Sequence, residues 1–212
     1  MSVRRGLRRC AAGCMLAACA VLGAGPAAAQ PLAPAAQPLV PAGQPLVPGA
    51  QSQNGNAGAL ERRVKAAFLY KFLGYADFPP GAFLDGASPV IIGVAGADDL
   101  AAELGRAVAG RTINSRPVVV RTLRDTDVQA PVHLLFVGGP DPVRVGRLVR
   151  QASAMLVVTE CEDGLRQGSV INFRIIDERV RFDVSLDAAE RNGIKLSSRL
   201  LTVANRVQKG VQ

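Results

Sequence analysis

Short apolar runs alternate with helical segments from about residue 60 onward, and this alternation limits the possible folds more than any other feature of the chain. Strand patterns cover 89–95, 117–121, 132–137, 155–159, 170–175 and 180–186. Helical patterns cover 60–76, 98–108, 141–152 and 197–207. Asp98 and either Ser197 or Ser198 are the expected N-caps of two of these helices.

The order of these patterns predicts the fold class. Strands that alternate with helices form parallel sheets, whereas the last two strands flank the polar pair Asp177 and Glu178 and predict an antiparallel hairpin. We therefore expect an α/β fold. It is a single domain whose mixed, mostly parallel sheet has helices on both faces and ends in a hairpin followed by a helix.

Residues 1–29 carry the three parts of an export signal. Arginines between positions 4 and 9 precede an apolar stretch over 10–25, and alanines at 27–29 form a small-residue cleavage site. Glycines interrupt the apolar stretch, which makes it a poor permanent membrane span. We expect a cleaved signal peptide. Lipidation of Cys19, which follows Leu16, Ala17 and Ala18, is the alternative.

Residues 30–59 are expected to form an extended, mostly disordered tether. The unit Gln-Pro-Leu-x-Pro starts at positions 30, 37 and 44, and residues 51–58 are rich in Gln, Asn, Ser and Gly. Proline has no backbone donor and fixes φ near the polyproline II value, so the repeat opposes both helix and sheet. The folded domain is therefore expected over residues 60–212.

Export changes the meaning of the charge and of the cysteines. The formal net charge is +8, but four arginines lie among the first nine residues and the rest of the chain carries only +4. A balance this small gives no reason to expect a nucleic-acid partner. Cys10, Cys14 and Cys19 belong to the signal, so Cys161 remains alone, without an internal disulfide or a zinc site. We expect an ordinary thiol near a strand end; a redox or intermolecular role is the alternative.

The sequence contains no recognisable catalytic arrangement. His133 lies inside an apolar run and is expected to be a strand residue rather than a base, and no Ser or Cys sits in a nucleophile elbow. The acidic residues Glu160, Glu162 and Asp163 lack the spacing of a calcium loop. We expect no catalytic residue, no metal and no cofactor, and hence a protein that is not an enzyme.

Glycine-rich turns provide one candidate ligand site. Gly96 and Gly138 each follow a strand, and Asp141 begins a helix, although neither turn completes a dinucleotide or P-loop motif. Open α/β sheets bind ligands in the crevice at the carboxyl ends of their strands. A periplasmic small-molecule sensor that uses a crevice at Gly96, Gly138 and Asp141 is therefore the alternative function.

The first helix has more apolar surface than a helix that covers a sheet requires. One stripe contains Val64, Phe68, Phe72 and Tyr75, and a second contains Ala66, Leu69, Tyr70 and Leu73. Either both stripes are core, or one of them contacts another protein chain. The candidate partner-binding residues are, on this helix, Phe68, Phe72 and Tyr75, and on and near the hairpin, Phe173, Arg181, Phe182 and Lys195.

Several blocks of sequence between residues 62 and 207 carry a family resemblance. They are VKAAFLYKF at 64–72 with DFP at 77–79, GRTI at 110–113, HLLFV at 133–137, MLVVT at 155–159, GSVINF at 168–173, VRFDVSLDAA at 180–189 and GIKLSSRLL at 193–201. In their order and spacing they resemble the YfiR family, the YfiR/HmsC-like group of bacterial periplasmic proteins.

The resemblance implies a non-enzymatic periplasmic regulator. In the best-known system, YfiR represses an inner-membrane diguanylate cyclase, YfiN, by binding its periplasmic sensor region. An OmpA-like outer-membrane lipoprotein, YfiB, sequesters YfiR and so releases cyclic-di-GMP synthesis, which favours biofilm. The partners implied for this chain are a YfiN-like cyclase, a YfiB-like lipoprotein and a second copy in a homodimer. The best-known member carries disulfides, so redox control does not carry over to a chain with Cys161 alone.

Overall fold

The computed structural model describes residues 50–210. The helices are α1 (Ala50–Gly74), α2 (Asp98–Val108), the 3-10 turn η1 (Asp125–Asp127), α3 (Pro142–Gln151), α4 (Leu186–Arg191) and α5 (Ser198–Val203). The strands are β1 (Ala76–Asp77), β2 (Val90–Ala95), β3 (Thr112–Ile113), β4 (Arg116–Leu123), β5 (Leu134–Val137), β6 (Leu156–Thr159), β7 (Ile171–Ile176), β8 (Arg179–Ser185), β9 (Lys195–Leu196) and β10 (Arg206–Gln208). The expected signal peptide lies outside the described residues.

Eight strands form the main sheet, in the order β10-β8-β7-β6-β5-β2-β4-β3. The neighbours from β4 to β7 pair in parallel, and β10 is also parallel to β8. The β7–β8 hairpin and the β3–β4 pair are antiparallel, while β1 and β9 form a small separate ladder. The structure thus confirms the α/β fold with a mixed, mostly parallel sheet.

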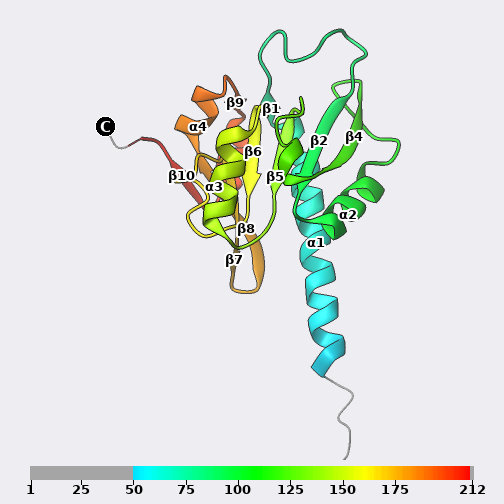
Figure 1. Cartoon of the computed structure of the whole chain (residues 1–212), viewed down its shortest axis with the longest axis vertical. Helices are drawn as coiled ribbons and strands as arrows, with labels where there is room; N and C mark the ends of the chain where they lie inside the picture. Colours follow the sequence, from blue (N-terminus) through cyan, green and yellow to red (C-terminus); the bar gives the residue numbers. More distant parts are fainter. Residues whose placement is uncertain (1–49, 211–212) are drawn as a thin grey trace, which may run out of the picture. The chain divides into compact units, whose positions relative to one another are not determined.

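The sheet separates two hydrophobic cores. Leu134 and Phe136 of β5 face one core, which α1 and α2 cover, whereas Leu135 and Val137 face the other, which α3 covers. All four side chains are buried, as expected for a parallel strand with helices on both faces. Figure 1 shows α1 and α2 side by side, with α3 over another part of the sheet.

Helix α1 is longer than expected. It begins at Ala50, so the segment expected to be an extended tether is helical over residues 50–59, and its remainder lies outside the described residues. The last proline of the repeat is Pro48, and no proline lies between it and the end of α1 to remove a helical hydrogen bond. Within residues 50–210, no helix combines the length and the hydropathy of a membrane span.

Two helix boundaries and one additional helix differ from the sequence expectations. Asp98 is the first residue of α2 rather than its cap, because Ala97 occupies the N-cap position without a side-chain bond. Helix α4, which the patterns missed, starts where the Ser185 side chain accepts a hydrogen bond from the N–H of Ala188. The last helix ends at Val203 instead of continuing to 207, because the chain then pairs with β8 as strand β10.

Candidate functional site

Four phenylalanine rings join α1 to the β7–β8 hairpin. The Phe72 ring centroid lies 5.7 Å from that of Phe173 and 5.0 Å from that of Phe182, and Phe68 lies 5.4 Å from Phe182. Phe173 and Phe182 are direct partners in the hairpin register, so both point toward the helix. Phe72, Phe173 and Phe182 are therefore buried inside the domain. These three candidate partner-binding residues are therefore core residues, and for Phe72 this is the core alternative that the sequence left open.

An apolar groove lies next to this cluster, between the first half of α1 and the hairpin. It has a volume of about 820 Å³ and is lined by Ala57, Leu60, Glu61, Val64, Phe68, Ile175, Glu178, Arg179, Val180 and Arg181. Leu60 is 61% exposed and Ile175 is 52% exposed, although both are large aliphatic residues. Figure 1 shows the hairpin tip and the first turns of α1 extending in the same direction. The groove therefore presents an apolar surface to solvent.

The hairpin side of the groove is also an open sheet edge. Strand β10 pairs with β8 only from Asp183 to Ser185, and the N–H of Asn205 donates to the carbonyl of Phe182. Toward the hairpin tip, the part of β8 from Arg179 to Arg181 has no second strand neighbour among the described residues. An open edge beside apolar side chains is a surface on which another chain can pair.

Charged side chains of both signs surround the groove. Glu178, Arg179 and Arg181 belong to the hairpin and take part in none of the ion pairs found between described residues. Glu61 faces the groove from α1 and also pairs with Lys65. An apolar centre with a charged rim is the usual anatomy of a protein–protein contact.

Lys65 of α1 forms an ion pair at the carboxyl ends of β5 and β6. Its Nζ lies 2.6 Å from Glu160 Oε2, and the other Glu160 oxygen accepts the N–H of Gly139 at 3.0 Å. Burial lowers the pKa of Lys65, but the hydrogen bonds and charges of Glu160 and Glu61 outweigh it, so this pKa is raised. Glu160 therefore belongs to a structural ion pair that joins α1 to the end of β6.

Arg144 fills the expected ligand crevice. Its Nη1 donates to the carbonyl of Gly138 at 2.7 Å, and its Nη2 and Nε donate to the Asp125 carboxylate at 2.6 and 2.8 Å. Gly96 has φ +72°, and a Cβ there would lie 2.5 Å from Arg144 Nη2. Asp141 caps α3 by accepting the N–H of Val143. The structure brings Gly96 and Gly138 together, but the protein's own guanidinium occupies the space between them.

The same pair shifts two pKa values. The hydrogen bond from Arg144 holds the pKa of Asp125 below its usual value, and the hydrogen bond to Asp125 raises the pKa of Arg144. Both groups therefore stay charged near neutral pH, and the contact that closes the crevice persists.

The only histidine, His133, is held by two hydrogen bonds, and Cys161 is buried. His133 Nδ1 accepts the N–H of Ile91 and its Nε2 lies 3.0 Å from the carbonyl oxygen of Ala82, which it meets as a donor. Burial lowers the pKa of His133, so the ring is neutral with both nitrogens engaged. Cys161 is buried, which raises the pKa of its thiol. Among residues 50–210, no three His, Cys, Asp or Glu side chains gather as a metal site.

The groove contains only part of the expected partner surface. Phe68 and Arg181 line it together, whereas Tyr75 packs against the core and Lys195 pairs with Asp77 in the separate β1–β9 ladder. The sequence reasoning missed Leu60 and Ile175. Leu60 lies one helical turn before Val64 and so extends the first apolar stripe. The expected start of the helix is residue 60, whereas the helix starts at Ala50, which places Leu60 well inside it.

Comparisons with known proteins identify one relationship. A family model described as YfiR/HmsC-like matches residues 62–205. No curated protein matches the chain. The matched span holds the hairpin and about half of α1, while Ala57, Leu60 and Glu61 at the outer end of the groove precede it.

Proposed function

The chain belongs to the YfiR/HmsC-like family, and we propose that it is a periplasmic regulator of cyclic-di-GMP signalling that acts by binding another protein. The family match supports the regulatory role. The more specific proposal is that the chain represses an inner-membrane diguanylate cyclase by binding its periplasmic sensor region, and so lowers cyclic-di-GMP and biofilm formation. The contact surface proposed for this binding is the groove between α1 and the hairpin.

The exposed apolar side chains of the groove are the observation that supports this proposal most. Leu60 and Ile175 are more than half exposed beside the half-buried Phe68, so a partner that covered them would remove a continuous apolar surface from water. Between Ala57 and Phe68 the helical wall of the groove is about 17 Å long, which suits a segment of polypeptide. The open edge of β8 can also provide backbone hydrogen bonds to such a segment.

Repression through binding requires no reactive group. A regulator shifts its target only by binding one conformation better than the other, and a preference of about 1.4 kcal/mol changes the equilibrium tenfold. Burying the groove residues can provide a difference of this size, because apolar burial contributes about 25 cal/mol for each Å² removed from water. The proposed mechanism therefore uses the apolar groove for affinity and its charged rim for selectivity.

Cellular cyclic-di-GMP provides the test. Deleting the gene should raise cyclic-di-GMP, the full-length protein should restore it, and a version without residues 1–29 should not. The variant Ile175→Glu should fail to restore repression, because it places a charge in the groove. Val203→Glu on α5 is the matched control, since Val203 is 60% exposed and lies outside the groove.

Both variants should melt within about 2 °C of the wild type, because surface substitutions change stability little. Unchanged cyclic-di-GMP on deletion would contradict the repressor proposal. Full repression by Ile175→Glu would contradict the assignment of the groove.

A second copy of the chain and an OmpA-like lipoprotein are the other partners proposed for this surface. Light scattering of the purified protein measures its molecular mass in solution and so shows whether a second copy binds. A dimer that Ile175→Glu dissociates and Val203→Glu does not would assign the groove to self-association. A stable monomer that binds the purified lipoprotein through Ile175 would assign the groove to the lipoprotein.

A further inference from the structure

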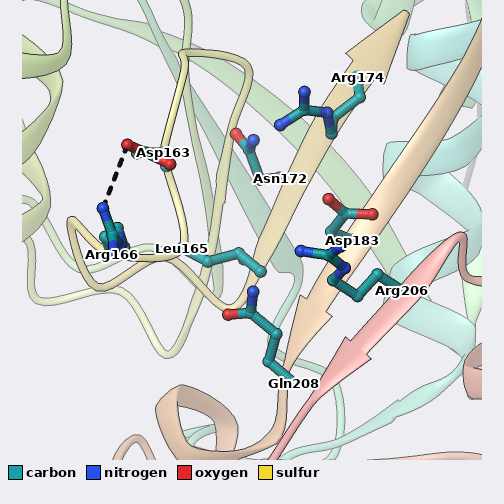
Figure 2. A pocket seen from close by; sticks show the side chains of 9 residues that line it. Asp163, Leu165, Arg166, Asn172, Arg174, Asp183, Arg206 and Gln208 are labelled. Atoms are coloured by element: carbon teal, nitrogen blue, oxygen red, sulfur yellow. Dashed lines mark ion pairs between the residues drawn. The ribbon is translucent and has the colours of Figure 1, made fainter. Parts of the chain in front are cut away.

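A polar pocket lies on the sheet face turned away from α1. Because side chains alternate along a strand, Asn172, Arg174 and Asp183 point away from the face on which Phe173 and Phe182 contact the helix. Figure 2 shows this pocket, whose volume is about 350 Å³. Its lining comes from β7, β8, β10 and the loop after β6, and consists of Asp163, Gly164, Leu165, Arg166, Asn172, Arg174, Asp183, Arg206 and Gln208.

Two arginines give the pocket an excess of positive charge. Arg174 and Arg206 are exposed, and neither takes part in an ion pair with a described residue. In Figure 2 Arg174 lies on β7 and Arg206 on β10, with Asp183 of the intervening strand β8 between them. The loop after β6 adds one acid and one base, Asp163 and Arg166, which form an ion pair with each other at 3.6 Å. Asp183 remains as the only carboxylate of the lining outside that pair, and it accepts the side-chain amide of Asn205 at 2.7 Å.

The register of the hairpin places like charges opposite each other. Arg174 of β7 is the direct cross-strand partner of Arg181 of β8, and both side chains are exposed. Like charges directly opposite each other on a sheet destabilise it. No ion pair within the described residues relieves this repulsion, whereas an anion bound beside Arg174 would offset part of it.

The floor of the pocket is rigid. Thr159 Oγ1 donates to Asn172 Oδ1 at 2.7 Å, and Asn172 Nδ2 donates to the carbonyl of Cys161 at 3.1 Å. Thr159 and Asn172 are buried, and any Cβ at Gly164 would collide with both of their side chains. A floor whose polar atoms are already paired keeps its shape when a ligand binds, which limits the entropy lost in that part of the pocket.

We propose that this pocket binds a small ligand bearing a phosphate or carboxylate group, held by Arg174 and Arg206. Guanidinium groups match both anions with parallel hydrogen bonds, and Asp183 and Gln208 can accept hydrogen bonds from donors elsewhere on the ligand. The volume is at the lower end of the range for small-molecule sites, which fits a ligand the size of an amino acid or a sugar phosphate. This site is separate from the groove and does not depend on the proposed regulatory function.

Titration of the purified, exported protein with sodium phosphate and with sodium citrate tests the proposal, with sodium chloride at equal ionic strength as reference. At least one anion should bind saturably by calorimetry and raise the melting temperature above the chloride reference, because it binds only the folded state. Arg174→Gln and Arg206→Gln should each weaken binding about 10- to 100-fold, as expected for loss of a charged hydrogen-bond donor. Arg121→Gln should leave binding unchanged, since Arg121 is an exposed strand arginine outside the pocket.

The melting temperature without ligand separates lost binding from lost structure. Arg174→Gln should melt at or slightly above the wild-type temperature, because it removes the repulsion with Arg181. Binding of phosphate alone would identify a phosphorylated ligand, and binding of citrate alone would identify a carboxylate. Three results would each overturn the proposal: no saturable binding of either anion, equal weakening by Arg121→Gln, or binding of a polyglutamate peptide without binding of the small anions.

Discussion

The substitution Phe72→Ala should strongly destabilise the domain. Phe72 has no exposed surface, and its ring contacts those of Phe68, Phe173 and Phe182 at centroid distances of 5.8, 5.7 and 5.0 Å. It therefore carries much of the packing between α1 and the hairpin. Alanine leaves a cavity at this junction, because backbone elements on both sides limit how far the core can collapse.

The expected loss can be estimated from the burial. Removing a fully buried phenylalanine side chain costs about 3–5 kcal/mol, which includes the lost transfer free energy and the cavity. A domain of this size has a total stability of about 5–15 kcal/mol. At roughly 150 residues, each kcal/mol lowers the melting temperature by about 3 °C, so the expected decrease is about 10–15 °C.

Urea unfolding at 25 °C, followed by far-ultraviolet circular dichroism, measures this loss directly. The midpoint should fall while the slope of unfolding free energy against urea stays the same, because the folded state remains compact. Leu60→Ala is the control, since Leu60 is on the same helix and largely exposed. It should change stability by less than about 0.5 kcal/mol.

A loss below about 1 kcal/mol for Phe72→Ala would refute this reasoning, since no fully buried ring between α1 and the hairpin could then be present. The expected result also limits the use of some variants. If Phe72 and Phe173 hold the core together, their substitution reports on folding, and only exposed residues such as Ile175 can map a partner.

Two smaller perturbations test the loops around the sheet. Burial lowers the pKa of His133 below its ordinary value of 6.5, so the unfolded chain takes up a proton near that pH whereas the folded domain takes it up only at lower pH. Stability should therefore fall as the pH is lowered through about 6.5, and His133→Gln should flatten the profile of melting temperature against pH in this region; an equal slope in the variant would refute the assignment. Gly96→Ala should cost about 1–3 kcal/mol in urea unfolding, because Gly96 has φ +72° and its Cβ would displace Arg144. Gly105→Ala, in the open on α2, is its control and should stabilise the helix by about 0.5–1 kcal/mol, so a similar loss at both positions would contradict the role of Arg144.

The fold class could be predicted because it depends on local periodicity. Runs such as that of β5 are apolar at every position, and buried parallel strands require this pattern. The ends of elements depend on distant partners instead. The residues after Val203 leave the helix because Arg206 pairs with Asp183 of β8, and no pattern within ten residues of Arg206 carries that information.

The candidate site shows the same limit. The stripe of α1 contains Phe68, which lines the groove, but the stripe does not indicate which of its aromatic residues the hairpin covers. Phe72 lies one turn further along the same stripe and is fully buried, because β7 and β8 pass over that turn and not over Leu60. Arg144 closes the glycine crevice by reaching Asp125, 19 residues away, which spacing in the sequence could not indicate.

Because Cys161 is buried, the reactivity of its thiol can be used to measure unfolding. It is the only cysteine after position 19, and its side chain is buried in the core that α3 covers. A colourless thiol reagent that turns yellow on reaction would therefore label only molecules that have opened. Its rate of labelling would measure how often the domain opens under native conditions. The same shielding slows oxidation of the thiol for as long as the domain stays closed.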